Sequence, residues 1–225
     1  MKIDNSIKAR WHGGTRNGTD ILYLVVHYTG NGGQTATAKG NASYFAATER
    51  KASAHYVVDE GDSIYQCVPD HVTAYAVGDA GKGTMKGVIT NGNSISIEMV
   101  SHSDTGGYYI PEETLARTAE LLRALRKKYP GIQGIYRHYD VTGKKCPAPL
   151  VAKEAWERFL DRVKEEDAEM KLYKHTTQMP DWAAASVRKA IGKGFLTVNS
   201  KGEISVYEPN LQVIVMMDRM GLLGE

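Results

Sequence analysis

Two short apolar stretches of the chain each end directly in a histidine. His27 follows "YLVV", and His138 follows "GIYR". Cys146 lies eight residues after His138, with Lys144 two residues before the cysteine. A hydrolytic zinc site typically needs three protein ligands of the histidine, cysteine or carboxylate type and one open position for water. Taken alone, the spacing leaves two interpretations open, which are a metal site or structural histidines beside a basic turn.

The elements that would position these residues follow from the pattern of apolar side chains. Residues 21–26, "ILYLVV", predict a buried central strand, and residues 131–138 predict a second short strand that ends at His138. In "SISIEMV", residues 94–100, the alternation places Glu98 on the face opposite to the isoleucines. Functional side chains are best held where a rigid strand ends and a loop opens. We therefore expect both histidines at strand ends and Cys146 on the loop that follows.

The remaining pattern predicts the fold class. A helix is expected over residues 35–51, a hairpin over 54–68, a helix over 111–129 and another from 151 to about 169. The order strand, helix, hairpin, strand, helix, strand, helix predicts an α/β domain with a mixed central β-sheet flanked by helices.

A run of charged residues over 162–171 marks a domain boundary. We expect a catalytic domain over residues 1–166 and a small, mainly helical C-terminal domain over residues 167–225. In the latter, one helix is predicted between Asp181 and Gly194 and another between Pro209 and Gly221. Because so short a segment is marginal as an independent fold, we expect it to dock on the main domain, to dimerise or to be one unit of a repeat.

Composition excludes several classes of partner. The 28 Lys and Arg residues against 26 Asp and Glu residues give a formal charge of +2, which offers no broad field for nucleic acid or an anionic membrane. No stretch has the pattern of a signal peptide or the apolar length of a membrane span. We therefore expect a soluble product that is made in the cytoplasm.

Four sequence motifs distinguish between the two interpretations that the spacing of single residues leaves open. "YLVVHYTG", "SAHYVVDEGDSIYQCVP", "SISIEMV" and "RHYDVTGKKCPAP" occur in this order across residues 21–149. Together they resemble the zinc-dependent N-acetylmuramoyl-L-alanine amidases of the phage lysozyme and peptidoglycan recognition protein superfamily. The resemblance implies a Zn²⁺ ion held by His27, His138 and Cys146. It also implies hydrolysis of the amide bond between N-acetylmuramic acid and L-alanine in bacterial peptidoglycan.

The resemblance also assigns roles to two charged residues. Glu98 matches a catalytic glutamate, which would take a proton from water and pass it to the leaving amine. Lys144 matches a catalytic lysine, which would stabilise the developing oxyanion. His55, in the "SAH" motif, is expected either to contact substrate or to serve in packing.

Two other functions stay open from the sequence. The chain could be a binding-only peptidoglycan recognition protein, although such relatives commonly lack the ligand cysteine that is present here. It could also be a thiol hydrolase that uses Cys146 and His138.

The C-terminal segment loosely resembles one surface-layer-homology cell-wall-binding unit. The order of the two domains resembles that of a phage or prophage endolysin, which stays in the host cytoplasm until it is released to the cell wall. The alternative role of the C-terminal domain is to form a homodimer.

Overall fold

The chain forms two compact units, residues 1–165 and 166–225. The computed structural model describes residues 1–33, 36–78, 81–164 and 172–224. The expected domain boundary after residue 166 and the predicted helical stretch beyond Lys164 lie outside those residues. Within them, no helix is both long and apolar enough to cross a membrane.

A six-stranded sheet forms the centre of the N-terminal unit, with the strand order β1-β4-β3-β5-β2-β8. Only β3 and β4 pair in antiparallel fashion, and every other neighbouring pair is parallel. The mixed α/β fold class that the sequence predicts is thus confirmed. The strands of this sheet are β1 (Lys2–Asp4), β2 (Tyr23–Tyr28), β3 (Tyr56–Val58), β4 (Ser63–Gln66), β5 (Ser94–Met99) and β8 (Gly134–Arg137).

The two faces of the sheet carry different kinds of side chain. On β2, Leu24 and Val26 enter the main apolar core, as do Ile95 and Ile97 on β5. Because side chains alternate along a strand, His27 and Glu98 project from the opposite face. The same register places these two residues directly beside each other across the parallel pair of β2 and β5.

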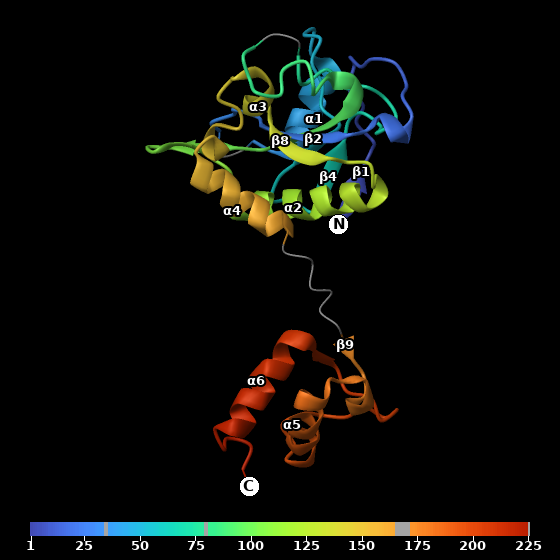
Figure 1. Ribbon diagram of the computed structural model, residues 1–225, viewed down its shortest axis with the longest axis vertical. Coiled ribbons are helices and arrows are strands. Elements are labelled where there is room, and N and C mark those ends of the chain that lie inside the picture. Colours follow the sequence, from blue (N-terminus) through green and yellow to red (C-terminus); the bar gives the residue numbers. More distant parts are fainter. Residues whose placement is uncertain (34–35, 79–80, 165–171, 225) are drawn as a thin grey trace. The chain divides into compact units, whose positions relative to one another are not determined.

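Helices cover both faces of the sheet (Figure 1). Helices α2 (Glu112–Lys128) and α4 (Lys153–Lys164) close the main core with apolar residues that include Leu122 and Phe159. On the other face, α1 (Ala38–Ala47) contributes Phe45 to a smaller apolar cluster. This arrangement leaves the rest of that face, near the carboxyl ends of the parallel strands, for the loops that carry the site.

Several local features differ from the prediction. Helix α1 begins at Ala38, because Thr37 accepts the N-capping hydrogen bond from the Gly40 amide at 3.1 Å. A short helix, α3 (His138–Thr142), follows β8 at once, and a separate hairpin of β6 (His102–Asp104) and β7 (Gly107–Tyr109) joins β5 to α2. These elements are too short to show an apolar periodicity, so they could not be predicted from the pattern of residues.

The C-terminal unit is an α-helical pair with a two-stranded ribbon. Helices α5 (Asp181–Gly192) and α6 (Glu208–Arg219) pack through Val187, Leu211 and further apolar residues. Strands β9 (Leu172–Tyr173) and β10 (Val206–Tyr207) pair in antiparallel fashion. The unit thus has an apolar core of its own.

A close backbone contact holds α3 in place. The segment after residue 80 lies against this helix, and the Lys82 and Met85 amides donate to the Thr142 and Asp140 carbonyls at 3.0 and 2.8 Å. A Cβ atom added at Gly83 would lie 2.3 Å from the Asp140 carbonyl oxygen. Only glycine allows the loop to approach α3 so closely.

Gly83→Ala is therefore expected to lower the free energy of unfolding by about 1–3 kcal/mol, because either α3 or the loop must shift. Denaturant unfolding followed by circular dichroism measures this change. Gly131→Ala is the matched control, since a Cβ at Gly131 meets nothing within 4 Å. An equal effect of the two substitutions would contradict the role of the close contact.

Candidate active site

Three neighbouring parallel strands deliver the predicted site residues to one edge of the sheet. His27 lies near the end of β2, Glu98 lies near the end of β5, and His138 comes directly after β8. Strand β2 lies between the other two and pairs in parallel with both. The carboxyl ends of parallel strands meet at the same edge, which is the usual place for a site in an open α/β sheet.

Helix α3 then turns the chain back so that Cys146 reaches the same place. Its first turn is held by Asp140, whose carboxylate accepts from the Arg137 amide at 2.8 Å and from the Arg137 guanidinium at 2.6 and 3.1 Å. The helix ends at Gly143, which has the left-handed φ of 75° that glycine adopts without strain. The Tyr139 amide donates to the Cys146 carbonyl at 2.7 Å and closes the loop.

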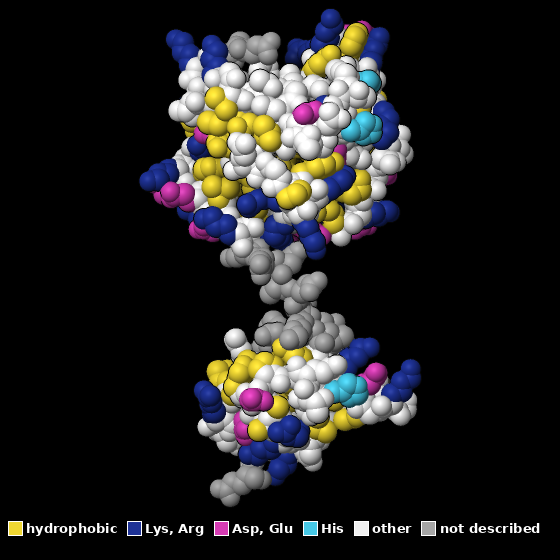
Figure 2. Space-filling view, turned by 45° about the vertical axis from the view of Figure 1, so that its right-hand side comes forward, with side chains coloured by type: hydrophobic (Ala, Val, Ile, Leu, Met, Phe, Trp, Pro, Cys, Tyr) yellow, Lys and Arg dark blue, Asp and Glu magenta, His cyan; other side chains and the backbone are white. Residues whose placement is uncertain are grey.

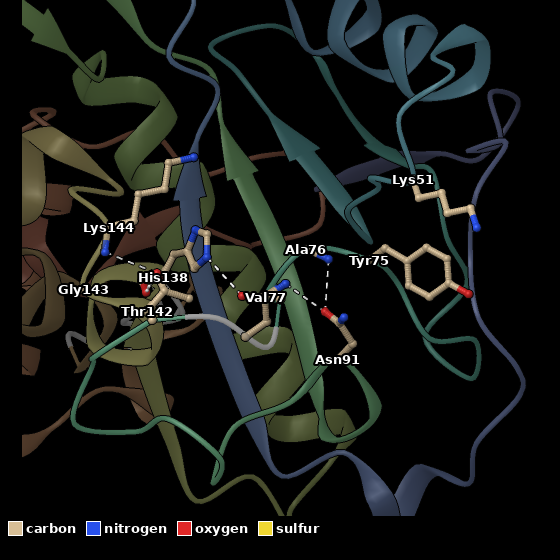
Figure 3. A pocket seen from close by; sticks show the side chains of 11 residues that line it. Lys51, Tyr75, Ala76, Val77, Asn91, His138, Thr142, Gly143 and Lys144 are labelled. Carbon is tan, nitrogen blue, oxygen red and sulfur yellow. Dashed lines mark hydrogen bonds between the residues drawn. The ribbon is translucent and has the colours of Figure 1, made fainter.

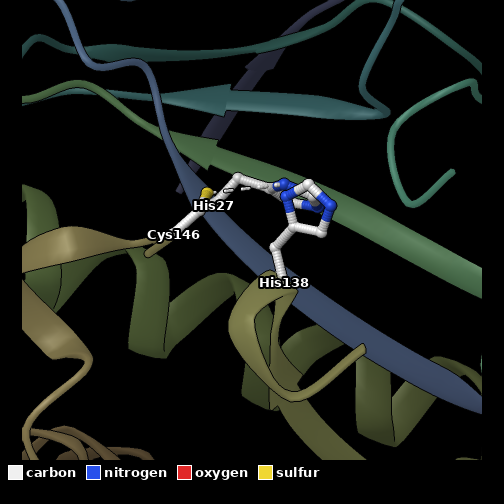
Figure 4. Close-up of side chains that lie close together, drawn as sticks. All are labelled: His27, His138 and Cys146. Carbon is white, nitrogen blue, oxygen red and sulfur yellow. Dashed lines mark hydrogen bonds between the residues drawn. The ribbon is translucent and has the colours of Figure 1, made fainter. Parts of the chain in front are cut away.

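The result is a compact cluster of His27, His138 and Cys146 (Figure 4). One ligand atom from each residue lies within 4.8 Å of the others. The His27 Nδ1 atom is 3.9 Å from the Cys146 Sγ atom, and the two imidazole centroids are 4.6 Å apart. His27 and Cys146 are buried, with exposed fractions of 2% and 4%.

The protonation state of the cluster suits a metal ion. The Val77 carbonyl oxygen lies 3.1 Å from His138 Nε2 and can only accept, so Nε2 carries the proton and Nδ1 keeps its lone pair. Burial, His138 and Lys144 lower the pKa of His27, and burial also lowers that of His138. Both rings are therefore neutral near pH 7, as metal ligands must be.

The unpartnered atoms of the site also fit a cation. Among the described residues, His27 Nε2 and Glu98 Oε2 are buried without a hydrogen-bond partner. Two imidazoles and a thiol within reach of one point form the borderline-soft donor set that zinc prefers. We conclude that the cluster can hold a metal ion, with Glu98 beside it.

Glu98 and Lys144 place one acidic and one basic side chain beside the cluster. Burial raises the pKa of the Glu98 carboxyl to about 8, and the positive charge of Lys144 acts in the opposite direction. A carboxyl group with a pKa near neutrality can both accept and donate a proton under physiological conditions. Lys144 is exposed, and its charge also acts on His27 and His138, so it lies within electrostatic range of the whole cluster.

Two hollows adjoin the cluster. A groove of about 830 Å³ runs from His138 and Lys144 past Val77 and Asn91 to Tyr75 (Figure 3). A second hollow of about 510 Å³ is lined by Glu98 together with residues of α1 and of the loop after β2. A substrate larger than one amide group therefore has room beside the reacting centre.

The structure places His55 away from this cluster. Its side chain is fully buried, and the Ser96 amide donates to its Nδ1 atom at 3.0 Å. Its Nε2 atom lies 3.0 Å from the Val72 carbonyl oxygen and 2.9 Å from the Arg16 Nη2 atom. Because Nδ1 accepts, Nε2 carries the proton and donates it to Val72. No ring nitrogen remains for a substrate, so packing is the role that its contacts support.

Sequence reasoning missed the contacts that hold His138. The Val77 acceptor is a backbone carbonyl, which leaves no trace in the residue type. Asn91, which holds the Val77 segment, lies in "NGN", a pattern that reads only as a turn.

The comparisons with known proteins place the chain in a family. The family described as N-acetylmuramoyl-L-alanine amidase matches residues 17–149. The amidase CwlL of Bacillus licheniformis is 39% identical over 137 residues, which are 57% of this chain and 36% of that protein. The chain thus spans about a third of the length of this curated relative.

Solved structures agree with the family match. The catalytic domain of XlyA has a TM-score of 0.57 at 25% identity and covers 72% of this chain and 99% of that one. A mutant endolysin from Bacillus subtilis has a TM-score of 0.53 at 25% identity, with 71% and 99% covered. Because the family match takes in more than half of the sequence, this chain belongs to the N-acetylmuramoyl-L-alanine amidase family.

Proposed function

We propose that the protein is a zinc-dependent peptidoglycan hydrolase that cleaves the amide bond between N-acetylmuramic acid and L-alanine. The observation that carries this proposal is the cluster of His27, His138 and Cys146, with the unpartnered Oε2 atom of Glu98 on the neighbouring strand. Membership of the amidase family supports the choice of bond, and the two adjoining hollows give room for parts of a substrate beyond that bond.

In the proposed reaction, zinc supplies Lewis acidity that polarises the scissile carbonyl and lowers the pKa of water. Glu98 takes a proton from the attacking water and gives it to the nitrogen of the departing L-alanine. Lys144 stabilises the negative charge that develops on the carbonyl oxygen. The products are a free alanine amine and a carboxylate on the lactyl group, so the proton taken from water is accounted for.

The two alternatives have less support. Burial and the nearby Glu98 carboxylate raise the pKa of the Cys146 thiol to about 12, which disfavours the thiolate that a thiol hydrolase needs. A binding-only protein has no use for a carboxyl oxygen that is buried without a partner, as Glu98 Oε2 is, and leaving one in place costs stability.

We further propose that residues 167–225 bind the cell wall and that the protein is an endolysin held in the host cytoplasm until its release. The exposed apolar residues of the C-terminal unit support a binding role, and Figure 2 shows such side chains on its surface. The exposed apolar residues of this unit include Trp182, Phe195, Met216 and Met220, with exposed fractions of 48, 59, 55 and 65%. Dimerisation through the C-terminal unit is the alternative.

The first prediction concerns the metal. Purified protein is expected to hold one zinc ion per chain, and Cys146→Ser is expected to lose it because a thiolate ligand disappears. Cys67→Ser is the matched control, since Cys67 is a buried thiol in a separate apolar cluster. Metal analysis after gel filtration measures both. Equal zinc content in the two variants would contradict the ligand assignment.

The second prediction concerns the reaction. Digestion of purified peptidoglycan is expected to release new N-terminal alanine without new reducing sugar. Glu98→Gln is expected to lower this rate roughly 100-fold or more while zinc content stays unchanged, because the amide cannot transfer the proton. New reducing ends without new amines would reject the amidase proposal, and undiminished turnover by Glu98→Gln would reject the proposed base.

The third prediction concerns the C-terminal unit. A chain that ends at residue 166 is expected to cleave soluble muropeptides at the full rate but to sediment with intact walls roughly tenfold less, because a second point of attachment is lost. Pelleting with purified walls measures this difference. Undiminished binding with a fall from dimer to monomer would favour dimerisation instead.

A further inference from the structure

Asn91 holds the backbone segment that faces the metal cluster. Its side-chain oxygen accepts hydrogen bonds from the Ala76 amide at 3.1 Å and from the Val77 amide at 2.8 Å (Figure 3). Two donors on consecutive residues fix both the position and the direction of this segment. Neither bond belongs to a helix or a strand, so the Asn91 side chain satisfies two backbone donors that secondary structure would otherwise satisfy.

The same segment holds His138. The Val77 carbonyl accepts from His138 Nε2 at 3.1 Å, on the residue whose amide is bound by Asn91. This bond sets the tautomer that leaves Nδ1 free as a ligand, and it orients the ring. A continuous path of hydrogen bonds thus runs from the Asn91 side chain through the Val77 peptide groups to His138.

Asn91 itself is anchored by the half-buried side chain of Arg16. The Arg16 Nη1 atom donates to the Asn91 and Gly92 carbonyls, both at 3.1 Å, and to the Ser94 carbonyl at 2.7 Å. Ser94 is the first residue of β5, the strand that carries Glu98. The support of His138 is therefore tied to the same strand that positions the proposed base.

We propose that Asn91 is a positioning residue for metal binding, which acts through Val77 to hold His138 in its ligating tautomer and orientation. The inference rests on the proposed function only in taking zinc as the ion. Groups that orient a metal-ligating histidine typically contribute 10–100-fold to metal affinity, and a residue that acts through one further contact belongs at the lower end of this range.

Asn91 also lines the groove, so a loss of activity alone would not distinguish positioning from substrate contact. Zinc affinity, measured without substrate by competition with a chelating dye, does distinguish them. Asn91→Ala removes the acceptor, whereas Asn91→Asp keeps an oxygen that accepts from both amides.

Asn93→Ala is the matched control. Asn93 organises the same turn by accepting from the Thr90 amide at 2.8 Å and donating to the Val88 carbonyl at 2.9 Å. Among the described residues, its side chain makes no hydrogen bond to the segment that holds His138, so its removal loosens the turn without releasing Val77.

The expected result is a zinc affinity about tenfold weaker in Asn91→Ala, and near the wild-type value in Asn91→Asp and Asn93→Ala. An affinity in Asn91→Ala within about threefold of the wild type would overturn the inference, as would equal losses in Asn91→Ala and Asn93→Ala. Failure of the wild type itself to bind zinc would instead contradict the proposed function.

A measurement on the unmodified protein tests the same contact should Asn91→Ala not fold. In hydrogen exchange followed by nuclear magnetic resonance, the Ala76 and Val77 amides are expected to be protected, because Asn91 is their acceptor. The metal-free protein is also expected to show His138 with a protonated Nε2 atom. Rapid exchange of both amides, or protonation at Nδ1, would overturn the inference.

Discussion

The parallel pairing of β2 with β5 on one side and with β8 on the other determines where each reactive group of this protein lies. The three strands end at one edge, so His27, Glu98 and His138 converge although they are far apart in the sequence. A slip of one residue in β2 would turn His27 into the apolar core and bring Val26 to the site. The buried residues of the main core, Leu24 and Ile97 among them, therefore specify the register on which the site depends.

The electrostatics of the site follow from its burial at this edge. Burial raises the pKa of both Glu98 and Cys146 and lowers that of His27. Each group is thus pushed towards its neutral form by the loss of water. A cation among them reverses the cost for the two acids and uses the lone pairs of the two imidazoles. Burial therefore disfavours the ionised cluster when no cation is present and favours the binding of a cation.

The sequence predicted much of this arrangement because the informative residues lie in regular strands. The apolar run before His27 and the alternation around Glu98 each have a simple period, which fixes the face and the end of the strand. Cys146 follows no such rule. Its spacing from His138 left a metal site as one of two interpretations, and the motif resemblance decided for the metal, since the turn through α3 and Gly143 has no periodic signal.

What the sequence could not provide are contacts made by backbone groups and by buried polar networks. The Val77 carbonyl has no signature in a residue type, and the turn containing Asn91 reads like any other. The "SAH" motif could not decide between substrate contact and packing for His55, because the choice depends on Ser96 and Val72, which approach it only in the fold. Satisfaction of buried polar groups is a tertiary property.

The central claim is that two imidazoles and one thiolate share a single zinc ion. X-ray absorption at the zinc edge of the purified full chain tests it most directly. The account predicts one sulfur ligand at about 2.3 Å together with nitrogen or oxygen ligands at about 2.0–2.1 Å, and the loss of the sulfur shell in Cys146→Ser. A zinc ion bound by nitrogen and oxygen alone in the unmodified protein would contradict it.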